Sequence, residues 1–187
     1  MKQHIRKVVF AALMAALVMA GSALRITLPV AIGSTTSFHL GNIMCALAGV
    51  LLGPGWGAAA AGIGSMLYDW TNPLFFSESW ITLITKAVYG LVAGLVAWSG
   101  DKKGEDYARN QIGTIAAAIA YAVLYLFKGF AYDGLLLGGL TPAAALAPVL
   151  LKIPATVFNA VLPMIFTPML ARAIRSGLKH SGLDPEF

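Results

Sequence analysis

The chain alternates between long apolar runs and short polar breaks. Two apolar runs, Leu40–Leu52 and Ala58–Leu67, flank a glycine-rich turn with the sequence GPGWG. Polar side chains occur only at the far ends of this pair, with His39 and Asn42 on one end and Asp69 on the other. If the runs are antiparallel helices, both polar ends lie at the same membrane surface. The pattern therefore predicts a polar pocket that opens to one side of a membrane.

Four further apolar segments bring the predicted number of spans to six. About 20 apolar residues cross a bilayer as a helix, so the chain has room for roughly six spans. The added spans are Val8–Leu24, Trp80–Ser99, Ile112–Ala131 and a last span ending near Ile174, which follows an irregular or short helical stretch up to Leu150. The predicted loops are Thr27–Ser37, Leu74–Ser79, Gly100–Asn110 and Tyr132–Thr141.

Composition supports an all-α membrane protein. The chain is 58% hydrophobic and 11% charged, whereas about 25% of a soluble protein is charged. We therefore expect one integral membrane domain, residues 1–187, with no room for a soluble catalytic or ATP-binding module. Cys45 is the only cysteine, which excludes an intrachain disulfide.

The distribution of lysine and arginine predicts the orientation. With six spans, nine of the 13 cations lie on the side that holds both termini and the Gly100–Asn110 loop. The positive-inside rule makes that side cytoplasmic. The net charge of +5 thus reflects membrane orientation and does not indicate nucleic-acid binding. The basic start also resembles a signal peptide with a possible cleavage site at Gly21–Ala23, but an uncleaved first span is simpler.

Polar side chains within the spans are the candidates for substrate contact. A charge at membrane depth costs about 2.5–3.5 kcal/mol on insertion scales, so such groups are usually paired, snorkelling or functional. The candidate substrate-binding residues are His39, Asn42, Asp69, Trp80, Lys86, Tyr125, Lys128 and Asn159.

Several of these residues have an alternative structural role. Lys86 could pair with Asp69 or Glu78, and Lys128 and Lys152 could form internal ion pairs in the same way. If two of these lysines face the pocket, the substrate should carry a carboxylate or another acceptor-rich group. Asn159 could instead form an interhelical hydrogen bond, and Arg25 is most simply an interfacial anchor.

Small residues recur every four positions in the first span. One set is Ala11 and Ala15, and the other is Ala12, Ala16 and Ala20. Spacing of four places each set on one face of a helix and permits close approach of another helix. This face could pack within the chain or dock on another membrane protein.

Common enzyme motifs are absent from the sequence. There is no G-x-x-x-x-G-K-[ST] phosphate loop, H-E-x-x-H, G-x-S-x-G or C-x-x-C. His39 with Asp69 is too sparse a set of ligands for a metal site. We therefore expect no enzyme activity, no cofactor and no metal.

At this point the chain resembles a substrate-binding S component of an energy-coupling factor (ECF) transporter, the vitamin importers of bacteria and archaea. The resemblance rests on the small-residue helix Ala11–Ala20, the H-L-G-N and L-L-G-P-x-x-G-A pattern between His39 and Ala58, and W-I-T-L-I-T-K with G-L-V-A-G from Trp80 to Gly94. It covers Lys7 to Trp98 well and the last two spans loosely. The riboflavin-type branch is closest by general pattern.

The resemblance implies the rest of a transport complex. Such subunits bind a vitamin-like small molecule at an outward-facing site in the prokaryotic plasma membrane and dock on a membrane T subunit. Two cytoplasmic ATPases drive transport. On this sequence, the implied docking residues are Ala12 and Ala16 with Ala11 and Ala15 as neighbours, and Thr27–Ser37 is the implied lid.

Two other functions are consistent with the same residues. An intramembrane enzyme or assembly factor could use His39, Asp69 and Lys86 as acid/base groups, and would turn over a lipid or isoprenoid substrate. A stand-alone secondary carrier would be favoured by inverted repeats, and none is evident in the chain.

Overall fold

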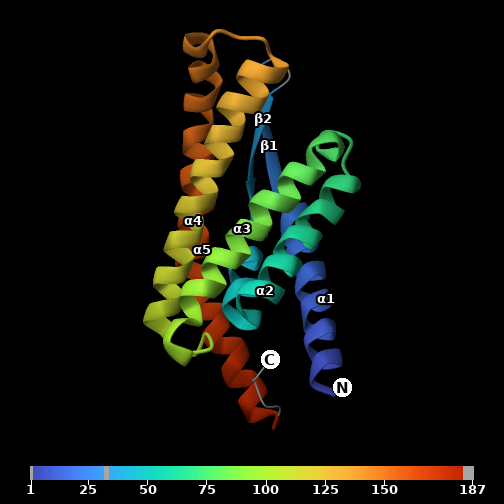
Figure 1. Ribbon diagram of the computed structural model, residues 1–187, viewed down its shortest axis with the longest axis vertical. Helices are drawn as coiled ribbons and strands as arrows, with labels where there is room; N and C mark the ends of the chain where they lie inside the picture. The colour runs from blue at the N-terminus through green and yellow to red at the C-terminus, as the bar shows by residue number, and fades with distance from the viewer. Residues whose placement is uncertain (1, 32–33, 183–187) are drawn as a thin grey trace.

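The computed structural model describes residues 2–31 and 34–182 of the chain. It is a helical bundle with one small β-hairpin (Figure 1). In chain order the elements are α1 (Lys2–Ala23), β1 (Arg25–Ala31), β2 (Ser34–His39), α2 (Gly41–Trp70), η1 (Phe76–Glu78), α3 (Ser79–Ala97), η2 (Ser99–Asp101), α4 (Tyr107–Lys128), η3 (Gly129–Leu137) and α5 (Pro142–His180).

Helix α2 is folded into two antiparallel arms at Gly53. This glycine has φ 81° and ψ −179°, a backbone conformation that is essentially restricted to glycine. The Cys45 sulfur lies 3.7 Å from the Ser65 hydroxyl, although residues 20 apart in a straight helix would be about 30 Å apart. The predicted hairpin is therefore present, and its two polar ends meet.

At the turn between the two arms, which we call the elbow, a side chain of another helix supplies a missing backbone hydrogen bond. Pro54 has no N–H, so the carbonyl of Val50 lacks its usual donor four residues on. The indole Nε1 of Trp98, at the end of α3, donates a hydrogen bond of 2.9 Å to that carbonyl. Gly94 then allows α3 to approach the elbow of α2 closely, because a Cβ added at this glycine would collide with the backbone of Pro54.

Five helices in the described part of the chain are long and apolar enough to cross a membrane. The predicted six spans count the arms of α2 separately. The first arm, Gly41–Leu52, is only about 18 Å long at 1.5 Å per residue, against a hydrocarbon core of about 30 Å. The count of six spans and the cytoplasmic position of both termini remain predictions.

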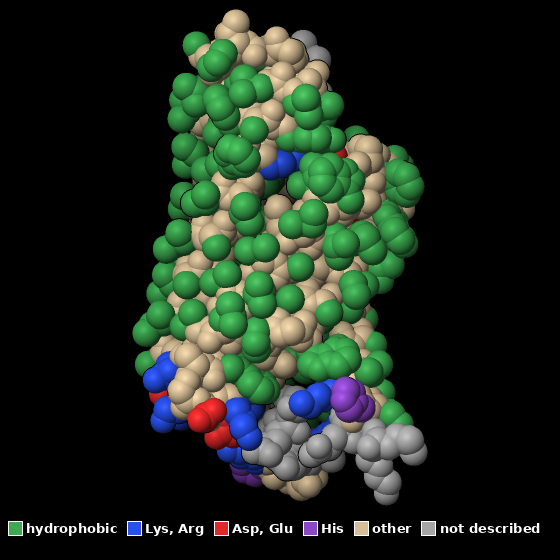
Figure 2. All heavy atoms as spheres, viewed as in Figure 1, with side chains coloured by type: hydrophobic (Ala, Val, Ile, Leu, Met, Phe, Trp, Pro, Cys, Tyr) green, Lys and Arg blue, Asp and Glu red, His purple; other side chains and the backbone are tan. Residues whose placement is uncertain are grey.

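Charged side chains gather at one end of the molecule. The start of α1, the end of α5 and the connection from α3 to α4 lie at the same end (Figure 1). Lysine, arginine and acidic side chains cluster there, while apolar side chains cover the middle of the visible face (Figure 2). This distribution agrees with the side predicted to hold most of the cations.

The prediction of a loop at Thr27–Ser37 is wrong. The segment forms the antiparallel strands β1 and β2, which pair from Arg25 opposite His39 to Ala31 opposite Ser34 with a register shift between Pro29 and Ala31; residues 32 and 33 lie outside the described part. Threonine and other β-branched residues favour strands. Pairing of the two strands also gives hydrogen-bond partners to backbone groups that would otherwise lack them.

The predicted glycine-rich loop Tyr132–Thr141 is also largely wrong. Helix α4 continues without a break into the π-helix η3, which ends at Leu137. The amide of Gly138 donates to the carbonyl of Asp133 at 3.0 Å, five residues back. In apolar surroundings the backbone must satisfy itself, which favours continued helix over an open loop.

The stretch from Pro142 to Leu150 is helical, one of its two predicted forms, but it is continuous with the last span and not a separate short helix. Helix α5 is a single element from Pro142 to His180, and the Thr141 hydroxyl caps its start. The prolines inside it release carbonyls that other helices use. The carbonyl of Asn159, four residues before Pro163, accepts from Asn42 at 3.1 Å, and the carbonyl of Met164, four before Pro168, accepts from Gln111 at 2.9 Å.

The two alanine sets of α1 have different environments. Ala11 and Ala15 are buried in the core, where they pack with residues of α2, so they are not available to a partner as predicted. A Cβ added at Gly64 would collide with the carbonyl of Ala15, which shows how closely the two helices approach. Ala12 and Ala16 are exposed on a neighbouring face, about 100° around the axis of α1.

Candidate functional site

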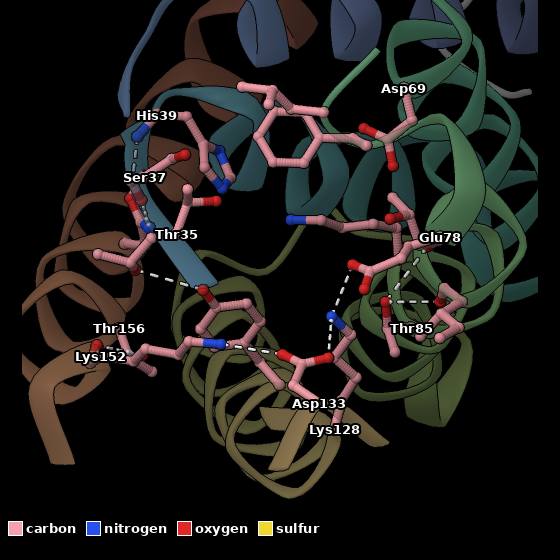
Figure 3. A pocket seen from close by; sticks show the side chains of 18 of the residues that line it. Thr35, Ser37, His39, Asp69, Glu78, Thr85, Lys128, Asp133, Lys152 and Thr156 are labelled. Carbon is pink, nitrogen blue, oxygen red and sulfur yellow. Dashed lines mark hydrogen bonds and ion pairs between the residues drawn. The ribbon is translucent and has the colours of Figure 1, made fainter. Parts of the chain in front are cut away.

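A cavity of about 420 Å³ lies in the half of the molecule away from the charged end. In Figure 2 it appears as a hollow in which blue and red side chains show between green ones. It is enclosed by β2, the end of α2, α3, α4, η3 and α5 (Figure 3). The lining residues are Arg25, Thr35, Thr36, Ser37, His39, Asp69, Leu74, Phe75, Glu78, Ile81, Thr82, Thr85, Lys86, Tyr121, Tyr125, Lys128, Asp133, Leu137, Gly138, Lys152, Thr156 and Asn159.

Strand β2 forms one wall and is held there by Asn159 of α5. The side-chain amide of Asn159 donates to the carbonyl of Ser37 at 2.6 Å, and its oxygen accepts from the amide of His39 at 3.1 Å. The Thr36 hydroxyl lies 3.3 Å from the Tyr125 hydroxyl of α4. Asn159 therefore lines the cavity and also has a structural role. Its side chain bonds strand β2, whereas the bond to another helix is made by its backbone carbonyl.

Lys86 of α3 enters the cavity without an acidic partner. Its side chain is 5% exposed, and its ammonium donates to the side-chain oxygen of Asn42 and lies 4.0 Å from the centre of the Tyr121 ring. No carboxylate of the described residues lies within 4.0 Å of it, so the predicted ion pair with Asp69 or Glu78 is not formed. An ammonium has three donors, which leaves capacity for a ligand.

Arg25 also lines the cavity, which the sequence prediction of an interfacial anchor did not include. Its guanidinium carbon lies 4.3 Å from the centre of the Tyr68 ring and 4.6 Å from that of Phe75. Its Nε donates to the carbonyl of Ser22 at 2.8 Å. Cation–π contacts of this kind stabilise a charge without neutralising it. Asp69 is buried at the end of α2, directly after Tyr68 in the chain, and also lines the cavity.

Lys128 and Lys152 are paired with acids. Lys128 lies 2.6 Å from Glu78 and 2.7 Å from Asp133, and Lys152 lies 3.0 Å from the other oxygen of Asp133. For these two lysines the internal ion pair, one of the two predicted roles, is present. Figure 3 shows the four side chains in a row along one side of the cavity.

His39 is buried at the end of β2 and neutral. Burial, together with the positive charges of Lys86 and Arg25, holds the pKa of His39 well below its usual range. Its Nδ1 has no hydrogen-bond partner among the described residues. A buried ring nitrogen without a partner is uncommon, and this one lies against Gly41, where an added Cβ would be 3.2 Å from it.

Two predicted contact residues do not line the cavity. Asn42 lies behind Lys86 and holds its ammonium. The Trp80 side chain is 53% exposed and packs edge-on against Tyr132 at 6.1 Å between ring centres. The other six predicted residues, His39, Asp69, Lys86, Tyr125, Lys128 and Asn159, line it.

Sequence reasoning missed Tyr121 and Asp133 entirely. Tyr121 is one helical turn before Tyr125, and their rings stack at 5.9 Å with an interplanar angle of 19°, so the (i, i+4) spacing was the available signal. Asp133 had no such signal, because its position depends on the π-helical turn. Among the described residues, no group of three or more His, Cys, Asp or Glu side chains could hold a metal ion.

A partly open cavity of this size, lined by both polar and apolar side chains within a helical membrane domain, is typical of a small-molecule-binding membrane protein. The model of one protein family, the ECF-type riboflavin transporter S component, matches residues 2–176, and the chain belongs to this family. No curated protein matches the chain. The protein is thus a multi-pass, substrate-binding transporter subunit, and its family is not one of enzymes.

Proposed function

We propose that this chain captures riboflavin, or a closely related flavin, in the cavity and delivers it to an ATP-driven import complex in the plasma membrane of a prokaryote. The observation that carries this proposal is the cavity of about 420 Å³ in a member of a riboflavin transporter family. Its volume falls within the range of about 300–1,000 Å³ that is usual for small-molecule sites.

The chemistry of the lining suits a flavin. A flavin has a flat aromatic ring, a ring edge on which carbonyl acceptors flank an N–H donor, and a polyhydroxyl chain. Lys86 supplies donors and Asp69 an acceptor for the ring edge, and Tyr121 and Tyr125 offer aromatic faces for stacking. The hydroxyls along β2, including Thr36, suit the polyhydroxyl chain. Of the lysines at the cavity, Lys86 is the one we propose to contact the ligand, because Lys128 and Lys152 have acidic partners.

The proposed partners are a membrane T subunit and two cytoplasmic ATPases. The sequence has no phosphate-binding loop, so an external energy source is required. The exposed residues Ala12 and Ala16 on α1 are the proposed docking positions, because small side chains let the backbone of a second helix come close. Ala11 and Ala15 are left out of this surface since they are buried.

Ligand binding by the purified protein tests the proposal. The protein in detergent is titrated with riboflavin, with flavin mononucleotide and with thiamine, a vitamin of unrelated shape, and binding is followed by isothermal calorimetry. We expect saturable binding of riboflavin at one site and none of thiamine. No binding of either flavin by folded protein, stripped of any co-purifying small molecule, contradicts the proposal.

A further inference from the structure

Asp133 joins three walls of the cavity through both of its carboxylate oxygens. One oxygen lies 2.7 Å from the Lys128 ammonium at the end of α4, and the other lies 3.0 Å from the Lys152 ammonium of α5. Lys128 in turn lies 2.6 Å from Glu78, which directly precedes α3. The row of four side chains, which we call the acid–lysine row, contains two cations and two anions and is electrically neutral (Figure 3).

The row lies in a place where ion pairs are not freely replaced by water. The Lys152 side chain is 4% exposed and that of Asp133 is 20% exposed. Both belong to helical segments of a membrane protein, where a charge without a partner is costly. Removing the Asp133 carboxylate would leave the buried Lys152 without its acid, because Asp133 is the one carboxylate within 4.0 Å of it among the described residues.

The π-helical turn is what brings Asp133 into the row. In an α-helix, positions five residues apart lie about 140° apart around the axis, so Lys128 and Asp133 would point to different sides. The wider π turn, which bonds each residue to the fifth one along, reduces this separation. π-helical turns are often associated with functional sites.

Few side chains of η3 are buried, and Tyr132 makes an aromatic contact with Trp80 of α3, edge-on at 6.1 Å between ring centres. The only fully buried residues of η3 are Gly129 and Gly134, neither of which has a side chain. Gly134 lies so close to α5 that an added Cβ would be 2.7 Å from the Cβ of Ala145. Leu136 and Leu137, at the end of η3, are exposed. The attachment of η3 to its neighbours therefore depends on close backbone contact with α5, on the Tyr132–Trp80 contact with α3 and on the Asp133 carboxylate.

We propose that Asp133 is a positioning residue that holds η3 against α3 and α5 and so keeps the cavity closed around a bound ligand. Lys86, Asp69 and His39 contact the ligand, whereas the acid–lysine row determines how long the ligand stays. Loss of Asp133 therefore speeds ligand release more than it slows ligand entry, because η3 is then held less firmly beside the bound ligand.

Asp133→Asn tests this role with a conservative rescue and a matched control. Asp133→Glu keeps the charge, and Glu105→Gln removes an acid from the exposed pair with Lys179, 3.5 Å away at the opposite end of the molecule. With riboflavin as the probe in stopped-flow measurements, we expect Asp133→Asn to raise the release rate at least about tenfold. The association rate should change little, Asp133→Glu should recover much of the loss, and Glu105→Gln should resemble the wild type.

A ligand-free measurement separates this inference from the flavin-binding function on which its kinetic test rests. Hydrogen exchange of the amides in residues 129–138, without ligand, should be faster in Asp133→Asn than in the wild type, with unchanged protection in α2. Gly134→Val, which displaces η3 from α5 without altering any charge, should have the same effect. If the wild type binds no flavin, the proposed function fails and the exchange measurement alone decides. Wild-type exchange and release in Asp133→Asn, or equal effects of Glu105→Gln, overturn the inference.

Discussion

At the scale of single residues, the environment of Lys86 differs from that of the other lysines at the cavity. Its ammonium is held by the neutral oxygen of Asn42 and the face of Tyr121, so its charge is oriented but not neutralised. Lys128 and Lys152, in contrast, are neutralised by acids. We therefore propose two functions for the three lysines at this cavity, ligand contact for Lys86 and support of the wall for Lys128 and Lys152.

Replacing Lys86 with methionine should weaken riboflavin binding about ten- to a hundredfold, since a hydrogen bond to a charged group contributes about 1.5–3 kcal/mol. Methionine keeps most of the buried side-chain volume. The dissociation constant from calorimetry provides the measurement. Lys102→Met, at an exposed position near the opposite end, is the control and should bind as the wild type does. Equal affinity in both variants would remove Lys86 from the ligand contacts.

His39 should make the stability of the protein depend on pH. Its pKa is held well below the usual range, first by burial and then by Lys86 and Arg25. In the unfolded chain the imidazole takes up a proton below about pH 6.5, while in the folded protein it stays neutral. The unfolded state then binds more protons, so stability falls as pH drops below that value, by at most about 1.4 kcal/mol per pH unit for this one group.

Melting temperatures in detergent between pH 7 and pH 5 measure this dependence. The decline should be smaller in His39→Gln than in the wild type, because glutamine cannot take up the proton. His180→Gln, at an exposed position near the end of α5, should retain the full decline. An unchanged slope in His39→Gln would show that other groups account for the acid sensitivity.

At the scale of elements, the elbow of α2 depends on one glycine. Gly53→Ala should destabilise the protein by roughly 1–3 kcal/mol, because its φ of 81° and ψ of −179° are unfavourable for any residue with a Cβ. An added Cβ would also lie 3.0 Å from the Trp98 ring. Thermal unfolding in detergent measures the change. Gly55→Ala, where an added Cβ meets no atom within 4 Å, should be neutral; equal losses at both positions would disprove the special role of Gly53.

The elements that could be predicted from the sequence are those in which an otherwise apolar segment has polar residues at one end only. The hairpin of α2 was evident because its two apolar runs had polar residues only at their far ends. The same reasoning brought His39, Asp69 and Lys86 to one cavity. Trp80 could not be assigned in this way, because an aromatic residue near a membrane surface can face lipid as readily as a site.

The elements that could not be predicted are those that tertiary surroundings decide. Glycine and hydroxyl residues in Thr27–Ser37 and Tyr132–Thr141 are typical of loops in water. In an apolar environment the backbone groups must bond to one another, which yields the hairpin β1–β2 and the π-helix η3. The position of Asp133 follows from η3, so the sequence pattern contained no sign of its role.

At the scale of the whole molecule, the proposed ligand site and the proposed docking face are separate surfaces. Ala12→Trp with Ala16→Trp should abolish riboflavin uptake by cells but leave the dissociation constant of the purified protein unchanged, because a bulky side chain prevents close helix contact. Ile119→Trp on α4, whose side chain is 57% exposed, is the control and should allow uptake. Loss of uptake and of binding together in the alanine variant would contradict docking through this face.

The interrupted hydrogen bonds of α5 have a consequence for the ligand. Pro163 frees the carbonyl of Asn159, the amide of Asn42 occupies that carbonyl, and the oxygen of Asn42 orients the Lys86 ammonium. The carbonyl left without a backbone donor in α5 therefore fixes the Asn42 side chain, which in turn orients the Lys86 ammonium of α3. The ring of Pro163, which lines no part of the cavity, thus helps to set the direction in which the Lys86 ammonium points into the cavity.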